Sequence, residues 1–195
     1  MGILVCFGDS ITARKEGSPF PILTSKLEQQ LTNWKIINAG VSGNNTYDAL
    51  KRIDSDVIIH NPDLVTILFG ANDAAFHKMV QLEEFGQNLL NMVIKIGSER
   101  VILISPAPVN EELQKSRTNE VLMNYSKEVE RVATITNSYY IDLFTLMINK
   151  PDYPSMLINE RNDGLHFGKY GYEFLSHTIS DKIKQLKKGN CTNPC

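Results

Sequence analysis

Ser10, Asp163 and His166 are the residues whose types and spacing could carry out chemistry. Ser10 stands in the tetrapeptide Gly-Asp-Ser-Ile at residues 8–11, which directly follows an apolar run at residues 3–7. A serine hydroxyl is a weak nucleophile until a general base lies within hydrogen-bond reach. His166 is a suitable base, and Asp163, three residues earlier, can fix the tautomer of its imidazole and stabilise the imidazolium. These residues predict acyl transfer through a serine nucleophile.

Each of these residues also fits a purely structural role, so the local motifs leave both alternatives open. Serine is common at helix N-caps, and Asn162-Asp163-Gly164 is a typical turn sequence. The other histidines are less suited to catalysis. We expect His60 in a surface turn and His177 inside the last helix, whereas His77, in a predicted loop, could line a site.

Acyl transfer also needs hydrogen-bond donors for the negative oxygen of the tetrahedral intermediate. Gly40 has no side chain and can bring its backbone N–H close to a substrate. Asn72 can offer its side-chain amide, and the backbone N–H of Ser10 would be a third donor. The structural alternatives are a plain turn around Gly40 and a helix N-cap at Asn72. Asp9, although adjacent to Ser10, is not among the predicted catalytic residues.

The elements that must position these residues are short apolar runs that alternate with amphipathic stretches. Continuous runs rich in Val and Ile are typical of strands buried on both faces. The predicted strands are residues 3–7, 35–38, 64–69, 101–105 and 139–143. The predicted helices are residues 21–31, 46–59, 82–96, 118–136 and 170–186.

Five β-α repeats predict an α/β fold in which helices cover both faces of a five-stranded parallel sheet. Ligands of such open sheets bind outside the carboxyl ends of the strands. Ser10, Gly40 and Asn72 each follow a predicted strand, and the loop with Asp163 and His166 follows the fifth. We therefore expect four separate segments to converge at one edge of the sheet.

Length and composition indicate an ordinary globular domain. The 195 residues are 42% hydrophobic and 22% charged, and no linker divides them. We predict one domain at residues 1–188 and a disordered tail at residues 189–195. The net charge of −2 gives no basic surface for nucleic acid. No apolar run approaches the roughly 20 residues that span a bilayer, and the N-terminus does not resemble a signal peptide. We expect a cytoplasmic protein, with a mature secreted form as the alternative.

The three cysteines do not predict a metal site. Cys6 lies in the first predicted strand, where it fits as a small buried hydrophobic residue. Cys191 and Cys195 lie in the predicted tail, and two cysteines without histidine partners are a weak metal signal.

The four blocks around Ser10, Gly40, Asn72 and His166, in this order and each following a strand, resemble the GDSL/SGNH hydrolase superfamily. The resemblance extends over residues 4–186. The four named residues of the superfamily correspond here to these four positions, and Asp163 corresponds to the aspartate that precedes the histidine. Gly-Asp-Ser-Ile is a common variant of the Gly-Asp-Ser-Leu block.

A closer resemblance is to isoamyl acetate-hydrolysing esterases within that superfamily. It rests on four segments, which are residues 69–75, 82–85, 101–108 and 163–167. The resemblance implies a flavodoxin-like, three-layer α/β/α sandwich. It also implies an esterase that acts on short-chain acyl esters of small molecules, without a metal or other cofactor. It does not fix the alcohol half of the substrate, and the oligomeric state is not predicted.

Two other classes of function fit the same sequence. One is a different acyl hydrolase on this fold: a carbohydrate O-deacetylase, a thioesterase or a lysophospholipase. The other is a non-catalytic flavodoxin-like binding module. An α/β-hydrolase fits poorly, because its nucleophile motif reads Gly-x-Ser-x-Gly. Both Ser10 and Ser42 lack the last glycine of that motif.

The acyl pocket is the least defined part of the predicted site. Four apolar residues flank the predicted chemistry and could line the pocket or belong to the core: Ile11, Ala71, Ala74 and Phe167. The small side chains of Ala71 and Ala74 would leave room for an acyl group beside Asn72.

Overall fold

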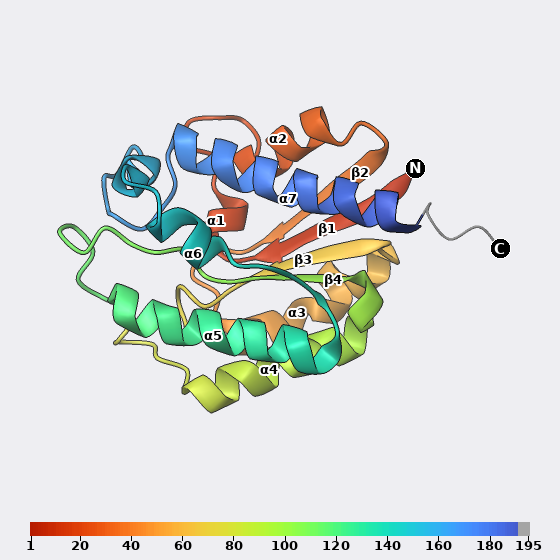
Figure 1. The fold of residues 1–195 in the computed structure, drawn as a ribbon, viewed down its shortest axis with the longest axis horizontal. Helices are drawn as coiled ribbons and strands as arrows, with labels where there is room; N and C mark the ends of the chain where they lie inside the picture. The colour runs from red at the N-terminus through yellow and green to blue at the C-terminus, as the bar shows by residue number, and fades with distance from the viewer. Residues whose placement is uncertain (191–195) are drawn as a thin grey trace.

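The computed structural model describes residues 1–190, and a five-stranded parallel sheet forms its centre (Figure 1). The strands are β1 (Gly2–Gly8), β2 (Trp34–Gly40), β3 (Leu64–Leu68), β4 (Val101–Ile104) and β5 (Tyr139–Ile141). Their spatial order is β2-β1-β3-β4-β5, and every neighbouring pair is parallel. The predicted α/β fold with five parallel strands is therefore confirmed.

Helices cover both faces of this sheet. The α-helices are α1 (Ser10–Ala13), α2 (Ile22–Gln30), α3 (Thr46–Asp56), α4 (Leu82–Ile96), α5 (Asn119–Thr136), α6 (Leu143–Ile148) and α7 (Lys169–Asn190). Three short 3-10 helices are η1 (Ile58–His60), η2 (Ser98–Arg100) and η3 (Tyr153–Leu157). In Figure 1, α2 and α7 lie above the sheet, whereas α3, α4 and α5 lie below it.

Two apolar cores hold the layers together, one on each face. The strands contribute to both, because successive side chains of a strand point to opposite faces. Val5 and Phe7 of β1 pack in the core beneath α3, α4 and α5, whereas Leu4 and Cys6 pack beneath α2 and α7. All four side chains are fully buried, as expected for a central strand.

The largest differences between the predicted and the observed boundaries are at two helices and one strand. The predicted helix over residues 46–59 ends at Asp56 and is followed by η1. The fifth strand ends at Ile141, because the Asp142 side chain caps α6 by accepting from the Thr145 N–H. Helix α7 continues to Asn190, so the first two residues of the predicted tail are helical. Cys191 and Cys195 lie outside the described residues.

The order in which strands are added to the sheet reverses between β1 and β3, although all strands are parallel. The chain runs from β1 outward to β2 and then returns to pair β3 with the other side of β1. Parallel sheets of this order leave a crevice at the carboxyl ends of the two central strands, where ligands bind. Within residues 1–190, no helix is both long and apolar enough to cross a membrane.

Candidate active site

Ser10 is the first residue of α1, directly beyond the carboxyl end of β1. Asp9 is the N-cap of this helix, and its Oδ1 accepts a hydrogen bond of 2.9 Å from the Ile11 N–H. Gly8 permits the tight exit from the strand, because a Cβ there would lie 2.9 Å from the Leu68 carbonyl oxygen. The Ser10 hydroxyl is thus held on a short helix whose position the sheet determines.

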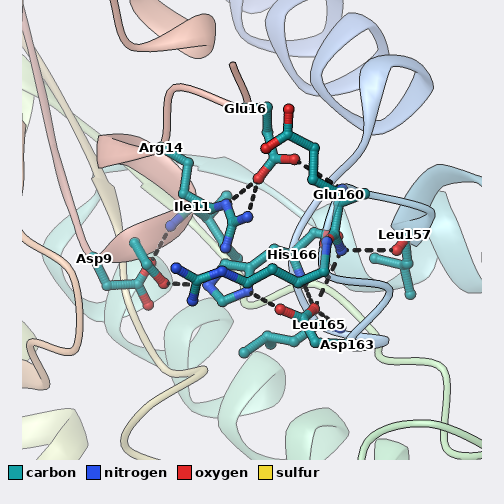
Figure 2. Close-up of polar contacts among 12 residues, drawn as sticks. Asp9, Ile11, Arg14, Glu16, Leu157, Glu160, Asp163, Leu165 and His166 are labelled. Carbon is teal, nitrogen blue, oxygen red and sulfur yellow. Dashed lines mark hydrogen bonds and ion pairs between the residues drawn. The ribbon is translucent and has the colours of Figure 1, made fainter. Parts of the chain in front are cut away.

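His166 and Asp163 form a hydrogen-bonded relay with Ser10. Ser10 Oγ lies 2.8 Å from His166 Nε2, and His166 Nδ1 lies 2.7 Å from Asp163 Oδ2. Ser10 and His166 are 156 residues apart in sequence. Figure 2 shows Asp163 and His166 side by side, with the second oxygen of the carboxylate turned toward the backbone of their own loop. This order of groups lets an imidazole remove a hydroxyl proton while a carboxylate fixes its tautomer.

The loop that carries Asp163 and His166 is held by hydrogen bonds within itself. Asp163 Oδ1 accepts from the backbone N–H groups of His166 and Leu165, at 2.9 and 3.0 Å. The Asn159 amide donates to the same oxygen at 3.2 Å and to the His166 carbonyl at 2.7 Å. Because these bonds fix the aspartate and the backbone of the histidine together, the relay geometry is set before any ligand binds.

The pKa directions of the pair suit a neutral base beside an ionised carboxylate. Burial lowers the pKa of His166, Asp163 raises it, and the nearby charges of Arg14 and Arg161 lower it again, with a net decrease. Burial would raise the pKa of Asp163, but hydrogen bonds from the backbone and imidazole of His166 hold it well below its usual range. At neutral pH the imidazole is therefore unprotonated at the nitrogen that faces Ser10.

Asn72 follows β3 and lies at the same cavity, with its side-chain amide already held by the protein. Its Nδ2 donates to the Asn44 carbonyl at 2.9 Å and to Asp9 Oδ2 at 3.2 Å. Both amide hydrogens therefore have acceptors within the protein. The bond to Asp9 is the longer of the two, so it is the one that a substrate oxygen could share.

Gly40 lies at the carboxyl end of the second strand, as the sequence predicted, but it does not line the cavity at Ser10. It is the last residue of β2, and its N–H donates to Asn38 Oδ1 at 3.0 Å. A Cβ at this position would lie 2.5 Å from the Ala13 nitrogen, so the glycine allows α1 to pack against the strand. Gly40 is absent from the residues that line the cavity at Ser10. Its role in the described structure is close packing.

Gly43, in the loop that follows β2, lies at the cavity instead. Its φ of +82° is in the left-handed region, which glycine adopts without strain. A Cβ there would meet nothing within 4 Å. Within residues 1–190, the N–H groups of Gly43 and Ser10 donate to no protein acceptor. Gly43 was not among the predicted residues, because both glycines stand in the same stretch of sequence and only the turn between them decides which one faces the site.

The cavity beside Ser10 has a volume of about 470 Å³ and a polar lining. This volume is within the range of small-molecule sites, about 300–1,000 Å³. Its lining residues are Ser10, Arg14, Lys15, Glu16, Ser42, Gly43, Asn72, Glu160, Arg161, Leu165 and His166. Leu165 is the one large apolar side chain among them. His77 is not part of the lining.

The four residues predicted for the acyl pocket are in the core. Ile11, Ala71, Ala74 and Phe167 are at most 5% exposed, and none lines the cavity. Ile11 and Phe167 pack with α2 and α7, whereas Ala74 packs in the opposite core. These four residues are close in sequence to Ser10, Asn72 and His166, but their side chains pack in the core and not in the cavity.

The Glu16 carboxylate at the cavity links the loop after α1 to the loop that carries the histidine. Arg14 pairs with Glu16 through its guanidinium, and both side chains are largely buried. Glu16 also accepts from the Glu160 backbone N–H at 3.2 Å, as Figure 2 shows. The loop after α1 is thereby joined to the loop that carries the histidine. The sequence offered no signal for this contact between segments 144 residues apart.

Known proteins are similar to this chain over most of its length. A model of the GDSL-like lipase/acylhydrolase family matches residues 6–174. The isoamyl acetate-hydrolyzing esterase 1 homolog of Homo sapiens is 33% identical over 213 residues, covering 94% of this chain and 83% of that protein. An acetylxylan esterase of Geobacillus stearothermophilus is 30% identical over 163 residues, covering 76% of this chain and 72% of that one.

A solved structure shares the complete architecture. The crystal structure of a lipase/acylhydrolase from Enterococcus faecalis superposes with a TM-score of 0.89 at 35% sequence identity. The match covers 95% of this chain and 97% of the other. The likeness therefore extends over nearly all of the fold that surrounds the cavity.

Proposed function

Because the chain belongs to the GDSL-like lipase/acylhydrolase family and is a carboxylic ester hydrolase, we propose that it hydrolyses short-chain acyl esters with Ser10 as the nucleophile. The observation that carries this proposal is the relay from Ser10 through His166 to Asp163, with separations of 2.8 and 2.7 Å. A helix N-cap serine would not need a histidine at this distance, nor a histidine so firmly tied to a carboxylate.

The first step acylates Ser10. His166 Nε2 removes the hydroxyl proton as Oγ forms a bond to the ester carbonyl carbon, and the carbonyl oxygen becomes an oxyanion. The bond to the alcohol oxygen then breaks, and the imidazolium gives its proton to the departing alcohol. Asp163 stabilises the imidazolium during this exchange and remains ionised itself. The alcohol leaves, and the acyl group stays on the serine.

The second step releases the acid. His166, neutral again, removes a proton from a water molecule as the water oxygen attacks the acyl carbon. The bond between the acyl carbon and Ser10 Oγ breaks, and the serine oxygen takes the proton back from the imidazolium. The enzyme returns to its starting state without a net change in any of the three residues.

Three donors at the cavity are suited to the oxyanion. The N–H groups of Ser10 and Gly43 have no acceptor within residues 1–190, and both residues border the cavity. The third donor is the Asn72 amide, which would share with the oxyanion the hydrogen that now reaches Asp9. Donors fixed in advance stabilise the developing charge without a reorganisation cost. Gly43 takes the place that the sequence predicted for Gly40.

Replacing Asn72 by alanine tests the side-chain donor. We expect a loss of about 2.7–4 kcal/mol of transition-state stabilisation, or 10²–10³ in kcat, as for the removal of one oxyanion donor. The measurement is steady-state hydrolysis of p-nitrophenyl acetate. Asn91→Ala, an exposed asparagine on α4, is the matched control. Turnover of Asn72→Ala equal to that of the control would remove Asn72 from the oxyanion hole.

A carbohydrate O-acetyl ester is a second candidate substrate, and the cavity lining supports it. Beside the single apolar residue Leu165, the walls carry Lys15, Glu160 and Arg161, whose side chains can bond sugar hydroxyls. The relative from Geobacillus stearothermophilus is named as an acetylxylan esterase. A long acyl chain, by contrast, would find little apolar surface to bury.

A substrate series separates these possibilities. We expect kcat/KM to fall from acetyl to butyryl to octanoyl p-nitrophenyl esters, because only Leu165 can cover added methylene groups. Acetylated xylooligosaccharides and isoamyl acetate should then be compared at equal concentration. A preference for the sugar ester would identify the polar walls as the alcohol site. A preference for octanoyl esters would contradict the short-chain proposal.

A further inference from the structure

Arg117 is a buried arginine that the proposed mechanism leaves without a role. It lies between β4 and α5, and it is 4% exposed. Its Nε and Nη1 atoms are buried and have no hydrogen-bond partner within residues 1–190. Burying a guanidinium without partners is costly unless opposite charge lies nearby. Negative groups close to Arg117 must therefore compensate this cation.

The segment that carries Arg117 is bonded to both sides of the site. The Ser116 carbonyl, next to Arg117, accepts from the Phe76 N–H in the loop that follows Asn72. Earlier in the segment, the Asn110 N–H donates to the Gly164 carbonyl in the loop of Asp163 at 2.8 Å. The segment that carries Arg117 is thus held between the loop that follows Asn72 and the loop that carries Asp163 and His166.

Two carboxylates of the site act on this guanidinium. Burial lowers the pKa of Arg117, and the charges of Asp9 and Asp163 raise it again. Asp163 is already compensated by His166 and by backbone donors. Asp9 has no ion-pair partner within the described residues. Its carboxylate accepts only from the Ile11 N–H and the Asn72 amide.

We propose that Arg117 is a positioning residue that acts as the buried counter-ion of Asp9. Its charge keeps Asp9 ionised, so that both carboxylate oxygens accept and the Asn72 amide stays turned toward the cavity. The same charge offsets the negative charge of the ionised Asp9 beside the oxyanion. The proposal rests on the function proposed above, because the amide matters only if it serves the oxyanion. Arg117 touches no substrate, and it is absent from the cavity lining.

The groups around Asp9 make its ionisation sensitive to this cation. Burial and nearby Asp73 raise the pKa of Asp9, the Ile11 N–H and Arg117 lower it, and the net result is a rise to about 7. Asp73 is itself buried and bonded to Thr46. On the α7 side, the neutral Tyr172 hydroxyl faces the same region and donates to the Ile11 carbonyl. Without the Arg117 charge, only backbone hydrogen bonds would oppose burial and Asp73, which raise the pKa of Asp9.

Arg117→Gln should shift the acid limb of the pH profile of kcat toward higher pH. An opposite charge within about 4–6 Å moves a carboxyl pKa by 1–3 units. We expect a shift of about one unit above the wild-type pKa of about 7, which lowers the ionised fraction of Asp9 at pH 7 and gives about a fivefold loss of kcat there, with recovery toward pH 9. KM should change less than about twofold, because the substitution leaves the contacts that bind the substrate in its ground state unchanged. Arg131→Gln, at an exposed arginine of α5, is the matched control, and Arg117→Lys should retain most of the wild-type profile.

A double variant shows whether the effect passes through Asp9. In an Asp9→Asn background the acid limb reports His166 alone, so Arg117→Gln should shift it much less than in the wild-type background. If Arg117→Gln alone does not fold, the double variant should fold, since both charges are removed together. An unfolded double variant, or an acid limb that Arg117→Gln leaves unshifted while activity falls equally at every pH, would assign Arg117 a packing role and overturn the proposal.

The ionisation of Asp9 can also be followed without any assay of activity. Carboxyl ¹³C NMR, assigned with Asp9→Asn, should show Asp9 titrating near pH 7 in the wild type and higher in Arg117→Gln. An unchanged Asp9 titration contradicts the counter-ion role even if the protein is an esterase. An inactive wild type, or an Asn72→Ala variant with full activity, instead contradicts the proposed function, so the two failures are distinguishable.

Discussion

Ser10→Ala is expected to lower kcat for p-nitrophenyl acetate by about 10⁶, the size of the loss when a serine hydrolase loses its nucleophile. Ser10 Oγ is the hydroxyl that lies 2.8 Å from His166 Nε2, and alanine removes it. A residual rate above that of water is expected from the oxyanion donors and from binding alone.

The fold of Ser10→Ala should be intact, because the change removes one oxygen from a side chain whose contact is the imidazole. Thermal unfolding followed by circular dichroism provides the control, and its midpoint should match that of the wild type within a few degrees. Activity within tenfold of the wild type in a folded variant would mean that the chemistry does not use this serine.

Asp163→Asn should lower kcat by about 10⁴ while leaving the loop in place. The asparagine oxygen can still accept from the backbone N–H groups of Leu165 and His166. Its amide, however, would donate to His166 Nδ1 and place the imidazole proton on Nε2. That nitrogen would then point a hydrogen at Ser10 and could not remove the hydroxyl proton.

The exposed Asp181→Asn variant on α7 is the matched control for loss of one carboxylate. Steady-state kinetics at pH 8 should give wild-type turnover for this control. Equal turnover of Asp163→Asn and Asp181→Asn would show that the carboxylate does not set the tautomer, and the relay would reduce to a serine–histidine pair.

The sequence predicted the sheet and the convergence of the site well, for a physical reason. A strand buried on both faces must be a continuous apolar run, so β1, β3 and β4 are visible without any tertiary information. Parallel strands end at the same sheet edge, and polar residues that follow them must therefore meet there. This rule places Ser10 and Asn72 at one sheet edge, whereas the loop of His166 reaches that edge only after α6 and η3, which follow β5.

The features that the sequence could not predict depend on contacts between loops. Gly40 and Gly43 are equivalent in a loop sequence until the packing of α1 against β2 requires one of them. The pairing of Glu16 with Arg14 and the Glu160 backbone joins segments with no shared periodicity. Arg117 stands in a polar stretch of sequence, and its burial follows from how this segment packs between two loops of the site.

The Asn72 amide links the predicted and the unpredicted parts of the site. Its residue type and its place after a buried apolar run are enough to predict a donor at this position. Its orientation comes from Asp9 and the Asn44 carbonyl, neither of which had a predicted role. Asp9 is therefore not a catalytic residue of the relay, but it supports the donor that faces the substrate.

The most direct test of Ser10 as the nucleophile is covalent labelling of the wild-type protein with a serine-directed fluorophosphonate, followed by peptide mass spectrometry. A serine activated by His166 should gain one phosphonyl group at Ser10. The label should be absent in Ser10→Ala and present in Ser42→Ala, whose serine borders the same cavity. An unlabelled wild type, or a label that remains when Ser10 is alanine, would contradict the assignment of Ser10 as the nucleophile.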